Sequence, residues 1–328
     1  MREEVDMRGS ERLLDRLERE QRLDAPAEAV SGFWSAALRS ERLRDVLSGR
    51  QLGHPLHPAA ILVPAGTLLS ATMLDTTGGA ALRPAARRLV GLGLLSAGPA
   101  ALAGWSDWLD TKGAERRVGL VHAASNVVGL ASYAISWRQR RRGARGLAAS
   151  LAGAAALGLG GWLGGHLAYA LGVGVDTTAF QRGPAEWTDV LATSEVTTEL
   201  RQVEIDGVPV LLTRVNGQVV AISDRCTHRG GPLHEGERTG GCVRCPWHGS
   251  QFELASGEVV QGPATRPQPV YEVRETGGRV ELRRSEVRTL RANPVGPSPS
   301  PDARLRISTE GQAVTSAAMH RTSQHGIW

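Results

Sequence analysis

Four apolar stretches without any charged residue follow one another in the middle of the chain. They lie between His57 and Asp75, Arg88 and Asp107, Arg117 and Arg138, and Arg145 and Asp176. A helix needs about 17–25 residues to cross a bilayer, a length that the last two stretches reach easily and the first two reach at the short end. A soluble bundle of buried helices is the alternative. Repeated stretches bracketed by charge favour a four-helix membrane domain at residues 51–178.

Residues 1–50 alternate arginine and glutamate around leucine and valine at spacings of three and four. That spacing predicts amphipathic helices in a charged N-terminal arm. The polar face carries both signs of charge, so a solvated arm packed on the protein and a membrane-surface helix both remain open. Residues 1–24 contain no apolar core of their own, so we expect no cleavable secretory signal there.

From residue 186 the pattern changes to short alternating segments that are typical of β-strands. Val208–Val215 and Val219–Ile222 flank the dipeptide Asn216-Gly217, which favours a hairpin turn. We therefore predict a small all-β domain at residues 186–284, so that a four-helix transmembrane bundle precedes a β-sandwich. Residues 285–328 are rich in proline, serine, arginine and alanine, and we expect this tail to be disordered.

Composition narrows the range of functions. The net charge of +5 is modest, and the arginines alternate with glutamate or flank apolar stretches, so we expect no nucleic-acid partner. The chain has only three cysteines, Cys226, Cys242 and Cys245, and they are close together in sequence. An odd number of clustered cysteines is a poor disulfide framework and a good indication of a metal site.

The predicted β-domain contains Cys226-Thr-His228 and, further on, Cys245-Pro-Trp-His248. Two thiolates on one iron and two neutral imidazoles on the other suit a [2Fe–2S] cluster held between two short loops. The imidazoles remove negative charge and raise the reduction potential above that of an all-cysteine cluster. A zinc site is the alternative, because zinc also takes two cysteines and two histidines, and Cys242 lies near in sequence.

These two motifs resemble the Rieske [2Fe–2S] family, and the resemblance extends over about residues 190–283. It implies a three-layer β-sandwich with the cluster at one tip. The implied metal ligands are Cys226, His228, Cys245 and His248. Electrons would leave through the two histidines, which the resemblance implies are partly exposed.

Other positions indicate the subtype. Gly231 and Trp247 stand where high-potential members of the family place a disulfide between the loops. Ser250 matches a serine that bonds to the cluster and tunes it, whereas Phe252 replaces a tyrosine. The chain thus resembles the ferredoxin or oxygenase-component subtype, which implies a potential toward the lower end of about −150 to +300 mV. We expect no complete Rieske oxygenase, because the short tail leaves no room for a catalytic iron domain.

The predicted membrane domain contains histidines, and ionisable residues inside a bilayer are candidates for function. Topology places them toward the end of the bundle from which the β-domain emerges. His57, His122 and His166 are candidate ligands of haem b or another metal, and a quinone site is the alternative. The simpler interpretation is that they act as interfacial anchors and helix caps, as we expect of His54.

The motifs Gly104-Trp-Ser-Asp107-Trp and Gly165-His166 resemble a family of predicted four-helix bacterial membrane domains of unknown function, over about residues 50–178. Some of its members are fused to Rieske domains. The resemblance implies no particular activity for this part of the chain.

Arginine and lysine are equally numerous on the two sides of the predicted helices, so they do not orient the protein. We expect a multi-pass protein of the cell membrane with its β-domain on the cytoplasmic face, because no export signal is recognisable. The leading hypothesis is a membrane-anchored carrier that transfers one electron at a time between a reductase or other redox partner protein and an acceptor in or near the lipid bilayer. The alternatives are a haem- or quinone-binding subunit of a larger oxidoreductase, and a redox sensor.

Overall fold

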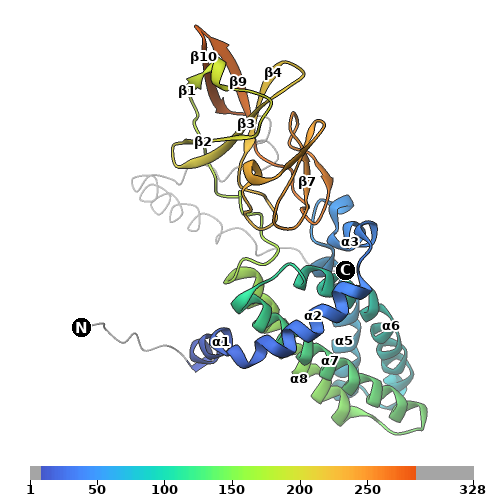
Figure 1. The fold of residues 1–328 in the computed structure, drawn as a ribbon. Coiled ribbons are helices and arrows are strands. Elements are labelled where there is room, and N and C mark those ends of the chain that lie inside the picture. Colours follow the sequence, from blue (N-terminus) through green and yellow to red (C-terminus); the bar gives the residue numbers. More distant parts are fainter. Residues whose placement is uncertain (1–8, 286–328) are drawn as a thin grey trace, which may run out of the picture. The chain divides into compact units, whose positions relative to one another are not determined.

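The structure is a computed structural model, and it describes residues 9–285. A helical part comes first and an all-β part follows, as the sequence predicts (Figure 1). The expected disorder of the tail concerns residues 286–328, which lie outside the described range.

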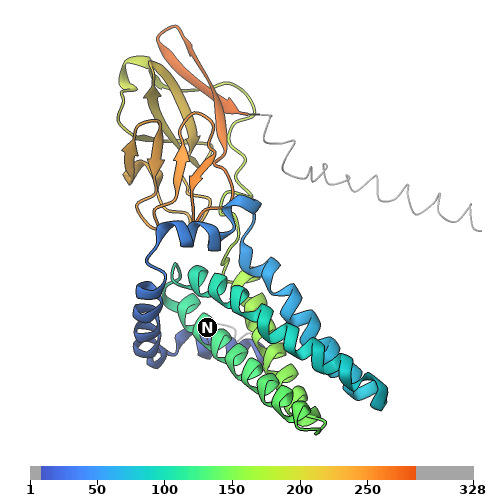
Figure 2. The same cartoon turned by 90° about the vertical axis from the view of Figure 1, so that its right-hand side faces the viewer.

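Four long apolar helices form the middle of the chain, and this prediction is confirmed. The first comprises α4 (Leu56–Ala60) and α5 (Leu62–Thr77), and the others are α6 (Arg83–Trp108), α7 (Gly113–Arg141) and α8 (Leu147–Tyr169). Each is long and apolar enough to cross a membrane. The helices lie side by side as a bundle in both ribbon views (Figures 1 and 2).

Small residues let these helices approach one another closely. A Cβ on Gly153 of α8 would lie 2.7 Å from the ring of Tyr133 on α7, so only glycine fits there. Tyr133 is fully buried, and its hydroxyl lies 2.7 Å from Oγ1 of Thr72 on α5. Close packing and hydrogen bonds between helices hold such a bundle together where lipid supplies no hydrophobic drive.

The N-terminal arm is helical in its described part. It comprises α1 (Gly9–Arg19), α2 (Asp24–Ala37) and α3 (Glu41–Ser48). Arg117 of α7 donates to both carboxylate oxygens of Asp24, at 2.6 and 2.8 Å. Such bidentate pairs fix orientation as well as distance, so the arm packs against the membrane helices. Helix α3 lies at the end of the bundle, beside loops of the β-domain (Figure 2).

The β-domain contains two antiparallel sheets. The first has the order β1-β10-β9-β4-β3-β2 and the second the order β5-β6-β7-β8. The strands of the first are β1 (Thr188–Ala192), β2 (Arg201–Ile205), β3 (Val208–Val215), β4 (Gln218–Ser223), β9 (Val270–Thr276) and β10 (Arg279–Arg284). Those of the second are β5 (Glu237–Thr239), β6 (Cys242–Arg244), β7 (Gln251–Glu253) and β8 (Val259–Gln261). The three layers that the family resemblance implies thus appear here as two hydrogen-bonded sheets.

The predicted hairpin at Asn216-Gly217 joins β3 to β4. Both residues have positive φ, at 52° and 83°, which is the backbone of the tight turn that such a dipeptide favours. Strand β3 is buried on both faces because it lies inside the larger sheet. Leu212 belongs to one apolar core, and Leu211 belongs to a second that also includes Cys226 and Cys245. The candidate metal ligands are therefore built directly on the core of the domain.

Candidate metal centre

The first ligand loop follows β4 and contains Cys226 and His228. The backbone N–H of Cys226 donates to the carbonyl of Gly231 at 2.9 Å, and Gly230 N–H donates to the carbonyl of Cys226 at 2.8 Å. Gly230 has a φ of 78°, which glycine adopts without strain. Outside the loop, Oγ1 of Thr177 donates to the carbonyl of Cys226 at 2.8 Å. These bonds close the loop tightly and fix the direction of its ligands.

The second ligand loop joins β6 to β7 and contains Cys245 and His248. Cys245 N–H donates to the carbonyl of Ser250 at 2.8 Å, and Gly249 N–H donates to the carbonyl of Cys245 at 3.1 Å. The two loops touch at Gly231, where a Cβ would lie 2.9 Å from Sγ of Cys245. The absence of a side chain at this position lets the two cysteines approach each other.

Both candidate sulfur ligands are buried, and backbone N–H groups surround them. The N–H groups of His228 and Arg229 donate to Cys226, and those of Trp247 and His248 donate to Cys245. The hydrogen bond with Cys226, together with these backbone donors, lowers the pKa of the Cys245 thiol to about 7. Donors of this kind stabilise a thiolate, which is the form that binds metal.

The two candidate histidines stand beside each other, with ring centroids 5.1 Å apart and ring planes at 89°. Nδ1 of His228 is buried and has no hydrogen-bond partner within the described residues. Burial lowers the pKa of His228 to about 3, so its ring is neutral. A neutral imidazole with a buried, unpaired nitrogen is suited to a metal and is costly without one. Two buried sulfurs and two adjacent neutral imidazoles thus fit a [2Fe–2S] cluster.

Cys242 lies apart from this group. It belongs to β6, and three residues of extended strand separate its Cα from that of Cys245 by ~10 Å. Within residues 9–285, no three His, Cys, Asp or Glu side chains are grouped as a single metal ion requires. Cys226 and Cys245 form one pair, and His228 and His248 form another. Two separate pairs suit a two-iron cluster better than the zinc site that the sequence left open.

Ser250 is fully buried beneath the second loop. Its Oγ accepts the N–H of Ala264 at 2.9 Å, so its own proton remains available to donate elsewhere. This free proton fits the role that the sequence predicts for Ser250, a hydrogen bond that tunes the cluster.

The tip that holds the four candidate ligands rests on the end of the helical bundle. Nε2 of His228 lies 3.8 Å from Oδ2 of Asp110, which follows α6. Asp110 also accepts a hydrogen bond from Arg44 of α3 at 2.6 Å. The neighbouring Arg229 forms an ion pair with Glu115 of α7. His228 consequently lies against charged residues of the helical part.

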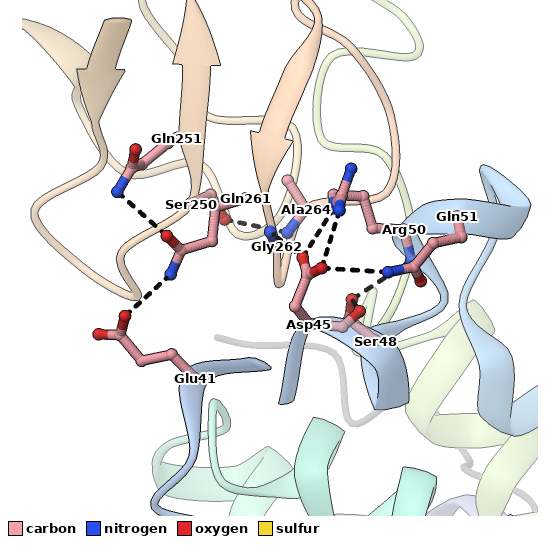
Figure 3. Close-up of polar contacts among 10 residues, drawn as sticks. All are labelled: Glu41, Asp45, Ser48, Arg50, Gln51, Ser250, Gln251, Gln261, Gly262 and Ala264. Carbon is pink, nitrogen blue, oxygen red and sulfur yellow. Dashed lines mark hydrogen bonds and ion pairs between the residues drawn. The ribbon is translucent and has the colours of Figure 1, made fainter. Parts of the chain in front are cut away.

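A second contact joins α3 to the region around β8 (Figure 3). The carboxylate of Asp45 accepts the N–H of Gly262 at 2.8 Å and a hydrogen bond from Arg50 Nε at 2.7 Å. A Cβ on Gly262 would lie 2.8 Å from Oγ of Ser48, so this contact also requires a glycine. Glu41 accepts from Gln261 at 3.4 Å at the edge of the same contact.

The second ligand loop also faces the helical part, across a cleft. A cleft of about 790 Å³ lies beside the second ligand loop and is lined by Trp247, His248, Glu41 and Asp110, among others. Trp247 is 54% exposed, and its ring centroid lies 6.5 Å from that of His248. Both candidate histidines therefore face the helical part. They differ in that His248, together with the exposed Trp247, lines the cleft, whereas His228 is not among the residues that line it.

The structure separates the candidate histidines of the membrane domain. His57 of α4 and His122 of α7 lie together, with ring centroids 6.3 Å apart. His166 of α8 instead has its Nε2 at 2.7 Å from Oε1 of Glu18, on the N-terminal arm. His54 is exposed in the turn before α4. Of the predicted set, only His57 and His122 are thus brought side by side.

Sequence reasoning missed the residues that seat the tip on the bundle. It gave no role to Asp110, Arg44, Asp45 or Glu115. Their partners lie 66 to 217 positions away in sequence. Charged residues next to helix ends are common, so no local signal distinguished these.

Comparison with known proteins agrees with this geometry. Residues 186–272 match the Rieske [2Fe-2S] domain family, and residues 53–177 match a family described as predicted membrane protein (DUF2231). The anthranilate 1,2-dioxygenase ferredoxin subunit of Burkholderia cepacia is 32% identical over 99 residues, which are 30% of this chain and 92% of that protein. The chain therefore belongs to the Rieske [2Fe–2S] family, in its ferredoxin type, and its cofactor is a [2Fe–2S] cluster.

Other relatives share only this domain. Apoptosis-inducing factor 3 of Mus musculus is 34% identical over 88 residues, which are 27% of this chain and 14% of that protein. A solved structure described as a complex of reduced oxygenase and oxidized ferredoxin in carbazole 1,9a-dioxygenase contains a chain that is 35% identical, with a TM-score of 0.28. That match covers 29% of this chain and 91% of the other.

Proposed function

We propose that this protein is a membrane-anchored Rieske carrier that transfers one electron at a time between a redox partner protein and an acceptor in the membrane domain. Cys226 and Cys245 hold one iron, and His228 and His248 hold the other. The observation that carries the proposal is the position of the two histidines: Nε2 of His228 lies 3.8 Å from Asp110 at the end of the bundle, and His248 lines a cleft beside the exposed Trp247.

The cluster, when bound, supplies a site that takes up or releases a single electron, and no substrate has to bind there. The surrounding residues direct that electron. Trp247 and His248 offer the partner an aromatic, partly exposed surface next to one imidazole. His228 extends the other imidazole toward α6, whose residues continue into the membrane domain. Entry and exit thus use different ligands.

The partner at the cleft is a protein. The name of the Burkholderia cepacia relative describes a ferredoxin subunit of a dioxygenase, that is, a carrier that serves another protein. By analogy we propose that a reductase or another redox protein docks at the Trp247–His248 side. Aromatic side chains are enriched among the residues that contribute most to such interfaces.

The protein is proposed to lie in the cell membrane with the Rieske domain on the cytoplasmic face, where soluble reductases are available. A cysteine placed at the exposed Ala255 in a Cys242→Ser background tests the orientation. A membrane-impermeant maleimide should label Ala255→Cys only after the cells are opened. Labelling of intact spheroplasts would place the domain on the outer face instead.

Low-temperature EPR of dithionite-reduced membranes tests the function itself. We expect a Rieske signal, with two irons and two labile sulfides per chain. Oxidised cluster should then be reduced by a flavoprotein reductase and reoxidised within the membrane. Zinc in place of iron and labile sulfide would end the proposal, and so would a cluster that exchanges no electrons with any protein or membrane component.

A further inference from the structure

The two histidines that the bundle brings together share an unusual bonding pattern. Nδ1 of His57 lies 2.8 Å from the carbonyl oxygen of Ala100 on α6, and Nδ1 of His122 lies 2.7 Å from the carbonyl oxygen of Gly160 on α8. A carbonyl only accepts, so each Nδ1 carries the proton and each Nε2 carries a lone pair. Metal-binding histidines are typically oriented in this way, with the second nitrogen held by a backbone carbonyl.

The lone pairs are available. Among residues 9–285, no hydrogen-bond partner occupies Nε2 of His57. Nε2 of His122 accepts from Asn126 Nδ2 at 3.1 Å, but that amide also donates to the His122 carbonyl at 2.9 Å and keeps this shorter bond if Nε2 is engaged elsewhere. Two acceptor nitrogens therefore lie close together inside an apolar bundle.

The distance and angle between the rings suit two ligands of one metal ion. The centroids are 6.3 Å apart and the planes cross at 82°. Two imidazoles on opposite sides of a metal, each with a metal–nitrogen distance of ~2 Å, have ring centres roughly 6 Å apart. We propose that His57 and His122 are the two axial ligands of a haem in the membrane bundle.

The number of protein side chains that can bind a metal here favours a metalloporphyrin over a bare metal ion. Within the described residues no third His, Cys, Asp or Glu joins the pair to form a group of three. A haem iron requires only two protein ligands, because the porphyrin supplies the other four nitrogens. Helical bundles build such sites from side chains on facing helices, and here the ligands come from α4 and α7.

Glycines keep both rings in place against the neighbouring helices. A Cβ on Gly104 of α6 would lie 2.8 Å from Cε1 of His57, and a Cβ on Gly164 of α8 would lie 3.0 Å from Cε1 of His122. Each ring is thus held by a carbonyl and a glycine of the same adjacent helix. This fixes the two rings relative to each other before any cofactor binds.

The site lies within reach of the Rieske tip. Gly104, which is close to His57, lies six positions before Asp110, which faces His228 and follows the end of α6. Six positions correspond to ~9 Å along a helix axis. One electron leaves the reduced cluster, which returns to its oxidised form, and it converts ferric haem to ferrous haem with no proton required. This electron transfer rests on the proposed function, whereas haem binding does not.

The test uses the full chain, purified in detergent from cells supplied with a haem precursor. We expect about one haem b per chain by the pyridine haemochrome assay, and a low-spin, six-coordinate optical spectrum. His57→Ala and His122→Ala should each lose at least tenfold in bound haem or convert it to a high-spin form. His166→Gln, which removes a histidine bonded to Glu18 instead, should keep haem content and spectrum unchanged.

In the same samples the Rieske EPR signal reports whether the β-domain of each variant is folded, and far-UV circular dichroism reports whether the helices are. A preparation without haem that also fails to bind added haemin would overturn the proposal, as would a stoichiometric metal without porphyrin. Unchanged low-spin spectra in both alanine variants would do the same. A protein that binds no haem but has a cluster that a partner can reduce would contradict the haem proposal and leave the carrier function intact. A protein that binds haem but has no cluster would contradict only the carrier function.

Discussion

Nε2 of His228 lies 3.8 Å from the Asp110 carboxylate, so a residue that follows α6 lies beside a proposed ligand of the cluster. Asp110 is 8% exposed and is also bonded to Arg44. A negative charge at this position favours the more positive, oxidised cluster. Because Asp110 is largely shielded from water, removing its single charge should change the reduction potential measurably.

Asp110→Asn should therefore raise the reduction potential of the cluster. A charge interaction of roughly 1 to 2 kcal/mol corresponds to about 40 to 90 mV for one electron. EPR-monitored redox titration of the purified chain measures this directly.

Arg44→Gln provides the matched control, because it removes the opposite charge of the same pair. It should lower the potential, and the double variant should lie between the two single variants. A potential that stays within error of the wild type in Asp110→Asn would show that the tip does not sit on Asp110 in solution.

Replacing one buried sulfur should remove the cluster altogether. Cys245→Ser, at a residue that is 3% exposed, loses the ligand and leaves a polar group in the core, so we expect loss of colour, iron and labile sulfide. Cys242→Ser should retain all three, because Cys242 lies outside the ligand loops. A colourless Cys242→Ser protein with normal folding would restore the zinc or mixed-ligand alternative.

Much of the fold follows from patterns within one segment. Charge-free stretches gave the four helices, and Asn216-Gly217 gave the hairpin between β3 and β4. The ligand motifs are equally local, because each loop contributes one cysteine and one histidine only two or three positions apart. Strands β1 and β2 were not predicted. They form the two opposite edges of the larger sheet, and only one residue of each strand is buried, so their hydrophobic alternation is weak.

Long-range contacts were beyond this reasoning. The bond between Asp45 and Gly262 joins residues 217 positions apart, and neither residue belongs to a recognisable motif. Topology correctly placed His57, His122 and His166 near the same end of the bundle. It did not show that the third would bond to Glu18, because helix rotation and the path of the arm decide that contact.

Ser250→Ala should lower the reduction potential. Ser250 Oγ already accepts from Ala264, so its proton is free to donate toward the cluster and stabilise the added negative charge of the reduced form. Loss of one hydrogen bond of ~1 kcal/mol corresponds to about 40 mV. Redox titration beside a Ser256→Ala control, which alters an exposed serine that lies beyond β7, should show the shift only in the first variant.

The contact between α3 and the Rieske domain should weaken in acid. Arg50 lowers the pKa of the Asp45 carboxylate, and the N–H of Gly262 lowers it further. A depressed pKa contributes stability that is present above the unfolded value, near 4, and is lost as pH falls through the folded value. Asp45→Asn removes this contribution, so its Tm should lie about 2–4 °C below that of the wild type at pH 7.

The two Tm values should draw together as the pH falls below ~4 and through the lowered pKa of Asp45, because the wild-type carboxylate becomes protonated only there. Asp189→Asn is the control, since its ion pair with Arg279 is exposed and should contribute little at any pH. A gap between the wild type and Asp45→Asn that stays constant with pH would contradict an ionised Asp45 at this contact.

Trp247 should determine how fast a protein partner exchanges electrons with the cluster. It is 54% exposed, it lies beside His248, and it is not one of the proposed cluster ligands. If a partner docks there, Trp247→Ala removes roughly 1 to 2 kcal/mol of contact energy and should slow reduction by the reductase about tenfold. Reduction by dithionite, which needs no docking surface, should be unchanged.

Phe180→Ala, at an aromatic residue that is 85% exposed and lies outside the cleft lining, should affect neither rate. Stopped-flow measurements that show equal reductase rates for both variants would mean that the partner does not dock at Trp247.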